Sequence, residues 1–265
     1  MAHRWPVGIN ALSAYILFSP STHTAFAADQ EVIITEVSAS TYDCSSATSS
    51  DTCTVRCQVA DPGGVTVNCG NAGHCEIHCD EKKCLGSATV TATDSGSLTI
   101  LSSAQECVKQ ASVYLPDSGT AVLQNYPGSK SYKQAKIYAG SNTQSILIDC
   151  NDGGTASNDD CKQLEVYAET AQYLEIAAGA DTDITDAIIN CPQSSSYSGP
   201  ELASCIIDIT GGGLIDTVTV NTLNGAPFDF WVKNDDELGN ILSLTLTCSA
   251  LDNNGDTISN ELHLS

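Results

Sequence analysis

The chain has 265 residues and is 42% hydrophobic, which is enough apolar material for one large domain or two small ones. Its 32 acidic and 10 basic residues give a formal net charge of −22, which disfavours nucleic acid as a partner. Thirteen cysteines indicate disulfides formed in an oxidising compartment, and their odd number leaves at least one thiol outside an intramolecular bridge.

Residues 1–27 are expected to be a signal peptide. Arg4 precedes the apolar run ALSAYILF at 11–18, and AFA at 25–27 is a small-x-small cleavage signal. The alternative is a buried strand or helix of a cytosolic protein, but the cysteines favour secretion. No later apolar run approaches the roughly 18 residues of a membrane-spanning helix, so we expect a secreted or cell-surface protein without a membrane span.

Residues 28–62 are expected to form the N-terminal cap of a repeat array. They fall outside the repeat described next, and they hold Cys44, Cys53 and Cys57 around a Ser/Thr-rich loop. Repeat proteins need such a cap because a terminal repeat otherwise exposes the apolar face that its neighbours bury.

A short motif recurs along residues 63–248. Three copies read VKQASVYLP (108–116), YKQAKIYAG (132–140) and CKQLEVYAE (161–169). With looser copies starting at 85, 184 and 215, the six starts lie 23, 24, 29, 23 and 31 residues apart. A base period of 23 or 24 residues with insertions is typical of a solenoid.

Each copy alternates apolar and polar residues, which predicts a strand with one buried face. A second alternating segment follows in each copy, such as ILIDC at 146–150. Equivalent strands of successive rungs would pair in parallel and stack like residues in columns, so we expect a right-handed parallel β-helix. The expected inward column is Ile137 with Val90, Val113, Val166 and Ile189.

A β-sandwich is the alternative fold, since short strands separated by turns also suit it. A β-sandwich does not explain, however, why similar residues recur every 23 or 24 positions. The longer periods place inserted loops at 151–160 and 193–204, and residues 249–265 read as a polar tail or partial last rung. An open last rung could pair head to tail with a second copy.

The layout resembles the cysteine-punctuated solenoid repeats of secreted and surface proteins of microbial eukaryotes, and more distantly the pectin-lyase type of β-helix. The resemblance covers about residues 63–248 and rests on the period, on CEIHC at 75–79 and on IINCP at 188–192. The cysteine-rich family has no established activity, so the resemblance implies a fold and a compartment only.

The cysteines are candidates for disulfides rather than for zinc. The segment CGNAGHCEIHC at 69–79 has the density of a zinc site, but strand alternation points Cys79 inward and His78 outward, away from a shared ion. We expect Cys84 to pair with Cys107, and Cys150 with Cys161. The candidates are Cys44, Cys53, Cys57, Cys69, Cys75, Cys79, Cys84, Cys107, Cys150, Cys161, Cys191 and Cys205.

Calcium is the metal that the acidic turns suggest, because it takes clustered carboxylate and carbonyl oxygens. Solvated turns are the other interpretation, since Asp and Asn are ordinary turn residues. The candidate calcium ligands are Asp152, Asp159, Asp160, Asp181 and Asp183.

Tyr114, Tyr138 and Tyr167 form an expected outward column. Aromatic rings on a flat face can stack on sugar rings, or they can stack on one another and stabilise the sheet. In the neighbouring column, Lys136 beside Glu165 is expected to form a cross-strand ion pair.

The sequence favours a structural, adhesive or glycan-binding role without catalysis, with extracellular polysaccharide or other surface proteins as partners. The alternative is a polysaccharide-active lyase or hydrolase that uses Asp149, Glu175 and Asp208. Catalysis has little support from residue types, because Arg56 is the only arginine after the expected signal peptide.

Overall fold

The computed structural model describes residues 29–35, 40–125, 132–150, 161–178, 182–193, 204–208, 214–223, 228–231, 240–241, 244–251 and 257–264. Within these ranges the chain forms strands and turns and no helix. None of the described segments is therefore a helix of the length and apolarity that a membrane span requires. The expected signal peptide lies outside the described residues, as do Asp152, Asp159, Asp160 and Asp181.

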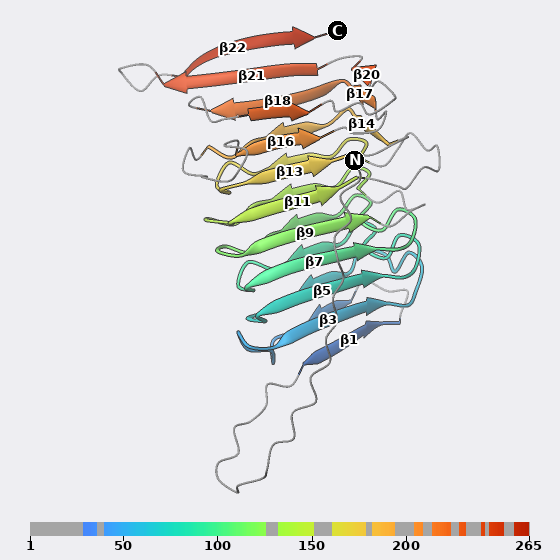
Figure 1. The fold of residues 1–265 in the computed structure, drawn as a ribbon. Coiled ribbons are helices and arrows are strands. Elements are labelled where there is room, and N and C mark those ends of the chain that lie inside the picture. Colours follow the sequence, from blue (N-terminus) through green and yellow to red (C-terminus); the bar gives the residue numbers. More distant parts are fainter. Residues whose placement is uncertain are drawn as a thin grey trace, which may run out of the picture.

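The described strands form three sheets and are stacked from β1 at one end of the molecule to β22 at the other (Figure 1). Sheets A and B extend along the stack, whereas the shorter sheet C lies only in the later rungs. Sheet A contains β1 (Gln30–Ile34), β3 (Thr52–Cys57), β5 (His74–Cys79), β7 (Ser97–Ser102), β9 (Thr120–Asn125), β11 (Ser145–Asp149), β13 (Leu174–Ala177), β16 (Cys205–Asp208) and β19 (Phe228–Trp231). Sheet B contains β2 (Thr41–Asp43), β4 (Thr66–Asn68), β6 (Thr89–Thr91), β8 (Ser112–Tyr114), β10 (Lys136–Tyr138), β12 (Glu165–Tyr167), β15 (Ile188–Asn190), β18 (Val218–Leu223), β21 (Leu244–Leu251) and β22 (Thr257–Leu264). Sheet C contains β14 (Asp183–Thr185), β17 (Leu214–Asp216) and β20 (Asn240–Ile241).

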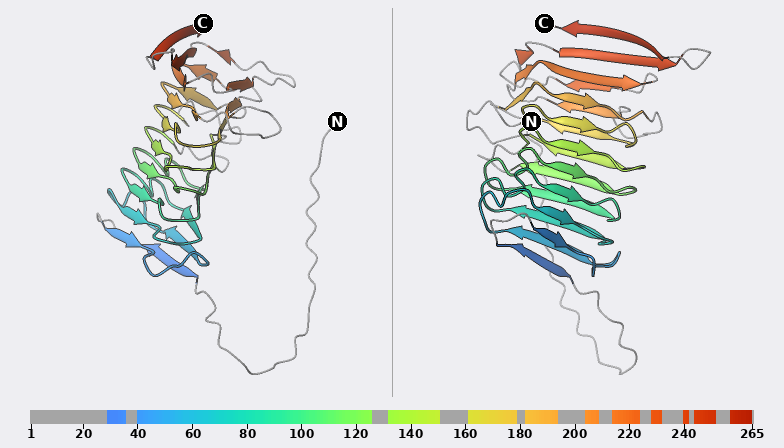
Figure 2. Two further views of the ribbon diagram at one scale, coloured as in Figure 1. Left: turned by 90° about the vertical axis from the view of Figure 1, so that its left-hand side faces the viewer. Right: turned by 180° about the vertical axis from the view of Figure 1, so that it is seen from behind.

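From β1 to β13 the chain alternates between sheets A and B, so that each rung adds one strand to both (Figure 2). In the later rungs a strand of sheet C lies between the strands of A and B along the chain. Strands of successive rungs pair in parallel, as in Lys136–Tyr138 against Glu165–Tyr167. The β-solenoid prediction is confirmed, and the β-sandwich alternative is wrong because the two sheets are built from alternating strands of one continuous coil.

The core contains two facing columns of branched aliphatic side chains. Strict alternation of buried and partly exposed residues, as along β5 and β7, turns every second side chain into the coil. The predicted column on sheet B is confirmed, and it contains Val67, Val90, Val113, Ile137, Val166, Ile189 and Val220. The facing column on sheet A contains Val55, Ile77, Ile100, Leu123, Ile148, Ile176 and Ile207. Each of these side chains contributes about 1.5–3 kcal/mol by its burial.

One corner of the coil, just before sheet B, is built from residues in the left-handed backbone conformation. That conformation is uncommon outside glycine, and here it turns the chain into the sheet B strands β6, β8, β10, β12, β15 and β18. Gln110 donates its backbone N–H to Lys133, Gln134 to Lys162 and Gln163 to Thr185, so the turns stack with their hydrogen bonds made. The corner column is Ser87 (φ 55°), Gln110 (58°), Gln134 (59°), Gln163 (56°), Asp186 (54°) and Thr217 (54°).

Six disulfides cross the interior of the solenoid. Three close the same turn between sheets B and A: Cys44–Cys53, Cys69–Cys75 and Cys191–Cys205. Two join the end of a sheet A strand to a corner in the next rung: Cys57–Cys84 and Cys79–Cys107. The sixth, Cys150–Cys161, is the pair that the sequence suggested.

The expected Cys84–Cys107 pair is wrong. These two cysteines occupy equivalent positions one rung apart, but each lies opposite the last residue of a sheet A strand. Their partners are therefore Cys57 and Cys79, with Cα atoms 5.9 Å apart in both bridges. Two cysteines that stack in one column need not pair with each other, because a cysteine across the interior also lies at a Cα–Cα distance that suits a disulfide.

The described strands at both ends of the solenoid belong to its sheets. The described strands of the segment 28–62 lie in the register of the solenoid, since β1 pairs in parallel with β3 and β2 with β4. At the other end, within the segment expected to be a polar tail or partial last rung, β22 pairs antiparallel with β21 and covers its edge.

We predict that the disulfides stabilise the fold more when they enclose a longer stretch of chain, with a logarithmic dependence on its length. Loop-closure entropy assigns about 3.6 kcal/mol to Cys79–Cys107, which spans 28 residues, and about 2.2 kcal/mol to Cys69–Cys75, which spans 6. Denaturant unfolding of the two double Cys→Ala variants measures the difference. Non-reducing peptide mapping is the control, and a peptide joining Cys84 to Cys107 would contradict the pairing.

Candidate functional site

Three tyrosines form a stacked ladder on the outward face of sheet B. Tyr114, Tyr138 and Tyr167 are register partners on β8, β10 and β12. Neighbouring ring centroids lie 4.9 Å apart, with interplanar angles of 12° and 5°. Both faces of the Tyr138 ring are therefore covered by the other two rings. A sugar ring cannot stack on Tyr138 in this arrangement, so the edges and hydroxyls are what the ladder presents.

An ion pair with an added hydroxyl lies in the next outward column. Lys136 Nζ donates to Glu165 Oε2 over 2.8 Å, and the Tyr167 hydroxyl donates to the same oxygen over 2.6 Å. The hydrogen bond from Lys136, then that from Tyr167, lowers the pKa of Glu165. The bond to Glu165 in turn raises the pKa of Lys136 and of Tyr167. The expected cross-strand ion pair is present, and the tyrosine ladder is tied to it.

A ladder of side-chain amides runs along the left-handed corner. Gln110 Nε2 donates to Gln134 Oε1 over 2.9 Å, and Gln134 Nε2 donates to Gln163 Oε1 over 2.8 Å. The left-handed turn places each glutamine directly above the previous one, because the same φ recurs at each rung. Sequence reasoning missed these residues, although the dipeptide Lys-Gln recurs in all three motif copies at 109, 133 and 162.

A groove of about 470 Å³ lies between the amide ladder and the ion-pair column. Its size falls within the range of roughly 300–1,000 Å³ that is usual for ligand sites. The lining residues come from two adjacent outward columns in successive rungs. They are Gln110, Gln134, Gln163 and Asp186 on the corner side, and Lys136, Glu165 and Ile188 on the sheet side.

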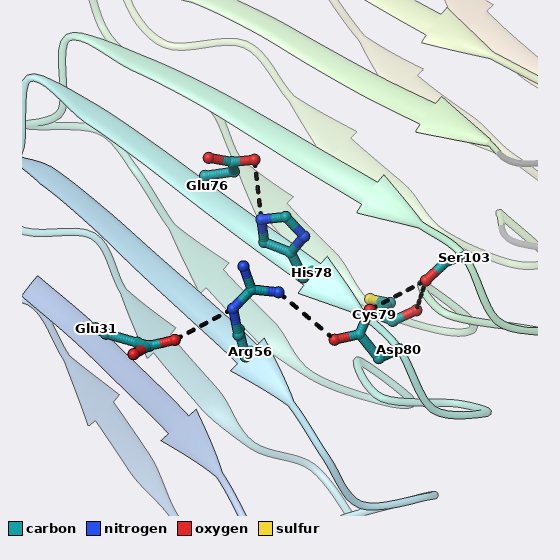
Figure 3. A network of polar contacts seen from close by, with 7 residues as sticks. All are labelled: Glu31, Arg56, Glu76, His78, Cys79, Asp80 and Ser103. Atoms are coloured by element: carbon teal, nitrogen blue, oxygen red, sulfur yellow. Dashed lines mark hydrogen bonds and ion pairs between the residues drawn. The ribbon is translucent and has the colours of Figure 1, made fainter.

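A second polar network lies on the outward side of sheet A near β1 (Figure 3). Arg56 Nε contacts Glu31 Oε1 at 3.2 Å in the rung before, and its Nη1 lies 3.9 Å from Asp80 Oδ2. His78 Nε2 lies 2.9 Å from Glu76 Oε1 on the same strand. The two Arg56 contacts link the first rungs, whereas the His78–Glu76 contact lies within β5. Each of these partly exposed contacts contributes little on its own.

The structure does not assemble a zinc site from the segment 69–79. Cys69 is bonded to Cys75, and Cys79 to Cys107, so their sulfurs are not available as thiolates. Across the described residues no group of three or more His, Cys, Asp or Glu side chains has the geometry to hold a metal ion. Of the five calcium candidates only Asp183 is described, and it is buried in β14 beside Leu214.

The three carboxylates suggested for catalysis do not share one column. Asp149 and Asp208 are aligned two rungs apart, with Ala177 between them. Glu175 lies in the neighbouring outward column, where the Tyr173 hydroxyl donates to its Oε2 over 2.7 Å. The aligned pair is thus separated by two strand spacings, about 9.6 Å between backbones.

No protein-family description, curated protein or solved structure matches this chain.

We predict that Tyr138 stabilises the fold more than Tyr114. Tyr138→Ala removes two ring contacts and Tyr114→Ala removes one, and each stacked pair is worth about 0.5–1.5 kcal/mol beyond burial. Urea unfolding of both variants should show this difference. Equal losses would mean that the rings do not act as a ladder.

The pKa of Glu165 gives a second test. Because it is lowered on folding, the ion pair's contribution is present above the unfolded pKa of roughly 4.3 and is lost as pH falls through the folded pKa. Carboxyl NMR titration should find Glu165 below the ordinary range, with Lys136→Met raising the pKa more than Tyr167→Phe does. A titration unchanged in Lys136→Met would contradict the pairing.

Proposed function

We propose that the protein is a structural and adhesive β-solenoid of the extracellular space, without chemistry of its own. The observation that carries this proposal is that its outward polar side chains bond to one another along the stack. Besides the tyrosine and glutamine ladders, Asn221 Nδ2 donates to Asn190 Oδ1 over 2.7 Å, and Gln172 Nε2 donates to Asn142 Oδ1 over 3.1 Å. Side chains engaged in this way stiffen a rod.

The six disulfides support the extracellular part of the proposal. They persist only in an oxidising environment, and they cross-link both the first and the later rungs. The expected signal peptide at residues 1–27 agrees with secretion or display at the cell surface.

Adhesion to extracellular polysaccharide is the finer part of the proposal. A rigid solenoid presents side chains at fixed intervals along its axis, which suits a polymeric partner with a regular repeat. The groove beside the amide ladder supplies a concave polar surface on which such a partner can be held.

The experiment that tests this function is a pull-down of the secreted, oxidised protein on a panel of polysaccharides, with calcium or with chelator, followed by mass analysis of the supernatant. We expect retention with no cleavage products. Cleavage would establish the lyase or hydrolase alternative, and Asp149, Glu175 and Asp208 would then be replaced one at a time. Retention on no polysaccharide would contradict the adhesive role. Loss of binding in chelator would assign calcium a part in it.

A further inference from the structure

We propose that the groove between the amide ladder and the Lys136–Glu165 column binds a neutral, hydroxyl-rich linear glycan that lies along the solenoid axis. The inference rests on the adhesive function proposed above, and it names both the surface and the chemical class of the ligand.

The direction of the groove follows from its lining. Gln110, Gln134, Gln163 and Asp186 belong to four successive rungs of one corner column. Strand spacings of about 4.8 Å make this wall about 14 Å long. A ligand that contacts the whole wall is therefore extended and runs across the strands. The amide repeat along the wall is close to the length of one sugar unit in an extended chain.

The amide ladder keeps hydrogen-bonding capacity for such a ligand. A carboxamide has two N–H donors and an oxygen with two lone pairs, and each bond of the ladder uses one donor and one lone pair. The Gln134 side chain, bonded on both sides, retains one N–H and one lone pair. Hydroxyl groups both donate and accept, so a row of amides matches a row of hydroxyls better than it matches a row of like charges.

The charges around the groove argue against an anionic ligand. Lys136 is neutralised by Glu165, which leaves Asp186 as the remaining charge among the lining residues. Of the neighbouring corner lysines, Lys109 is paired with Glu106 at 3.2 Å, and Lys133 and Lys162 are likewise engaged in interactions. The chain as a whole carries −22, which repels polyanions. The single unpaired charge of Asp186 is also too little to bind a polycation.

Ile188 provides the apolar contact that sugar binding needs. It lines the groove and is 42% exposed, although it lies on an otherwise polar outward column. The ring C–H groups of a sugar can pack on this side chain while its hydroxyls face the amides. The tyrosine rings, whose faces cover one another, are not required.

The test compares Gln163→Ala with Gln172→Ala in the full-length oxidised protein. Gln163 and Gln172 are each joined to a neighbouring rung by one side-chain amide hydrogen bond, but only Gln163 lines the groove. Binding of a soluble neutral β-glucan, a polyuronate and a deacetylated amino-glycan is measured by calorimetry. We expect the neutral glucan to bind best, about fivefold to tenfold more weakly to Gln163→Ala, and equally to Gln172→Ala and the unchanged protein.

Ile188→Ala is a second variant, which costs no core packing and should weaken the same binding about threefold. Neutral-glucan binding that both groove variants leave unchanged would overturn the groove assignment while the adhesive function stands. Stronger binding of the polyuronate or the amino-glycan would overturn the ligand class. Binding of none of the three would overturn this inference, and retention on the wider panel would then decide the adhesive function separately.

Discussion

Parallel, in-register pairing of successive rungs is the constraint on which the structure depends. A strand that pairs with its equivalent one rung later must place like positions about 4.8 Å apart, on both the inner and the outer side of the coil. Inside, this stacks Val113 on Ile137 on Val166 and excludes water along the axis. Outside, it brings the side chains of neighbouring rungs within bonding distance, so each outward column must be compatible with itself.

The outward columns show how an acidic chain meets this requirement. Although 32 residues are acidic, Glu165 stacks between Lys136 and Ile188, and Glu175 pairs with Leu147 and Ile206. In the three regular copies of the motif, the outward columns contain amides, which hydrogen-bond to one another, and aromatic rings, which stack on one another. The same stacking that stabilises the tyrosine ladder covers both ring faces of Tyr138, and the candidate site is therefore placed in the amide-lined groove.

The sequence predicts the features that depend on period and alternation: the solenoid, its inward columns and the tyrosine column. It did not predict that β1, β2 and β3 belong to the register. The recurring Lys-Gln dipeptide is absent there, and cysteines replace aliphatic residues at the turn between sheets B and A. The predicted disulfide partner of Cys84 was wrong, because pairing depends on distances across the interior, and the repeat period carries no information on these distances. The sequence did not predict the amide ladder, because glutamine is an ordinary surface residue. No local sequence signal indicates the left-handed turns at Gln110, Gln134 and Gln163.

The most direct test of in-register stacking is a nuclear Overhauser measurement on protein with labelled tyrosine rings. Stacking predicts contacts between the rings of Tyr114 and Tyr138 and between those of Tyr138 and Tyr167, with Tyr138 shifted most by ring currents and no contact between Tyr114 and Tyr167. Absence of the Tyr114–Tyr138 and Tyr138–Tyr167 contacts, or contacts between tyrosines that the register keeps apart, would contradict it.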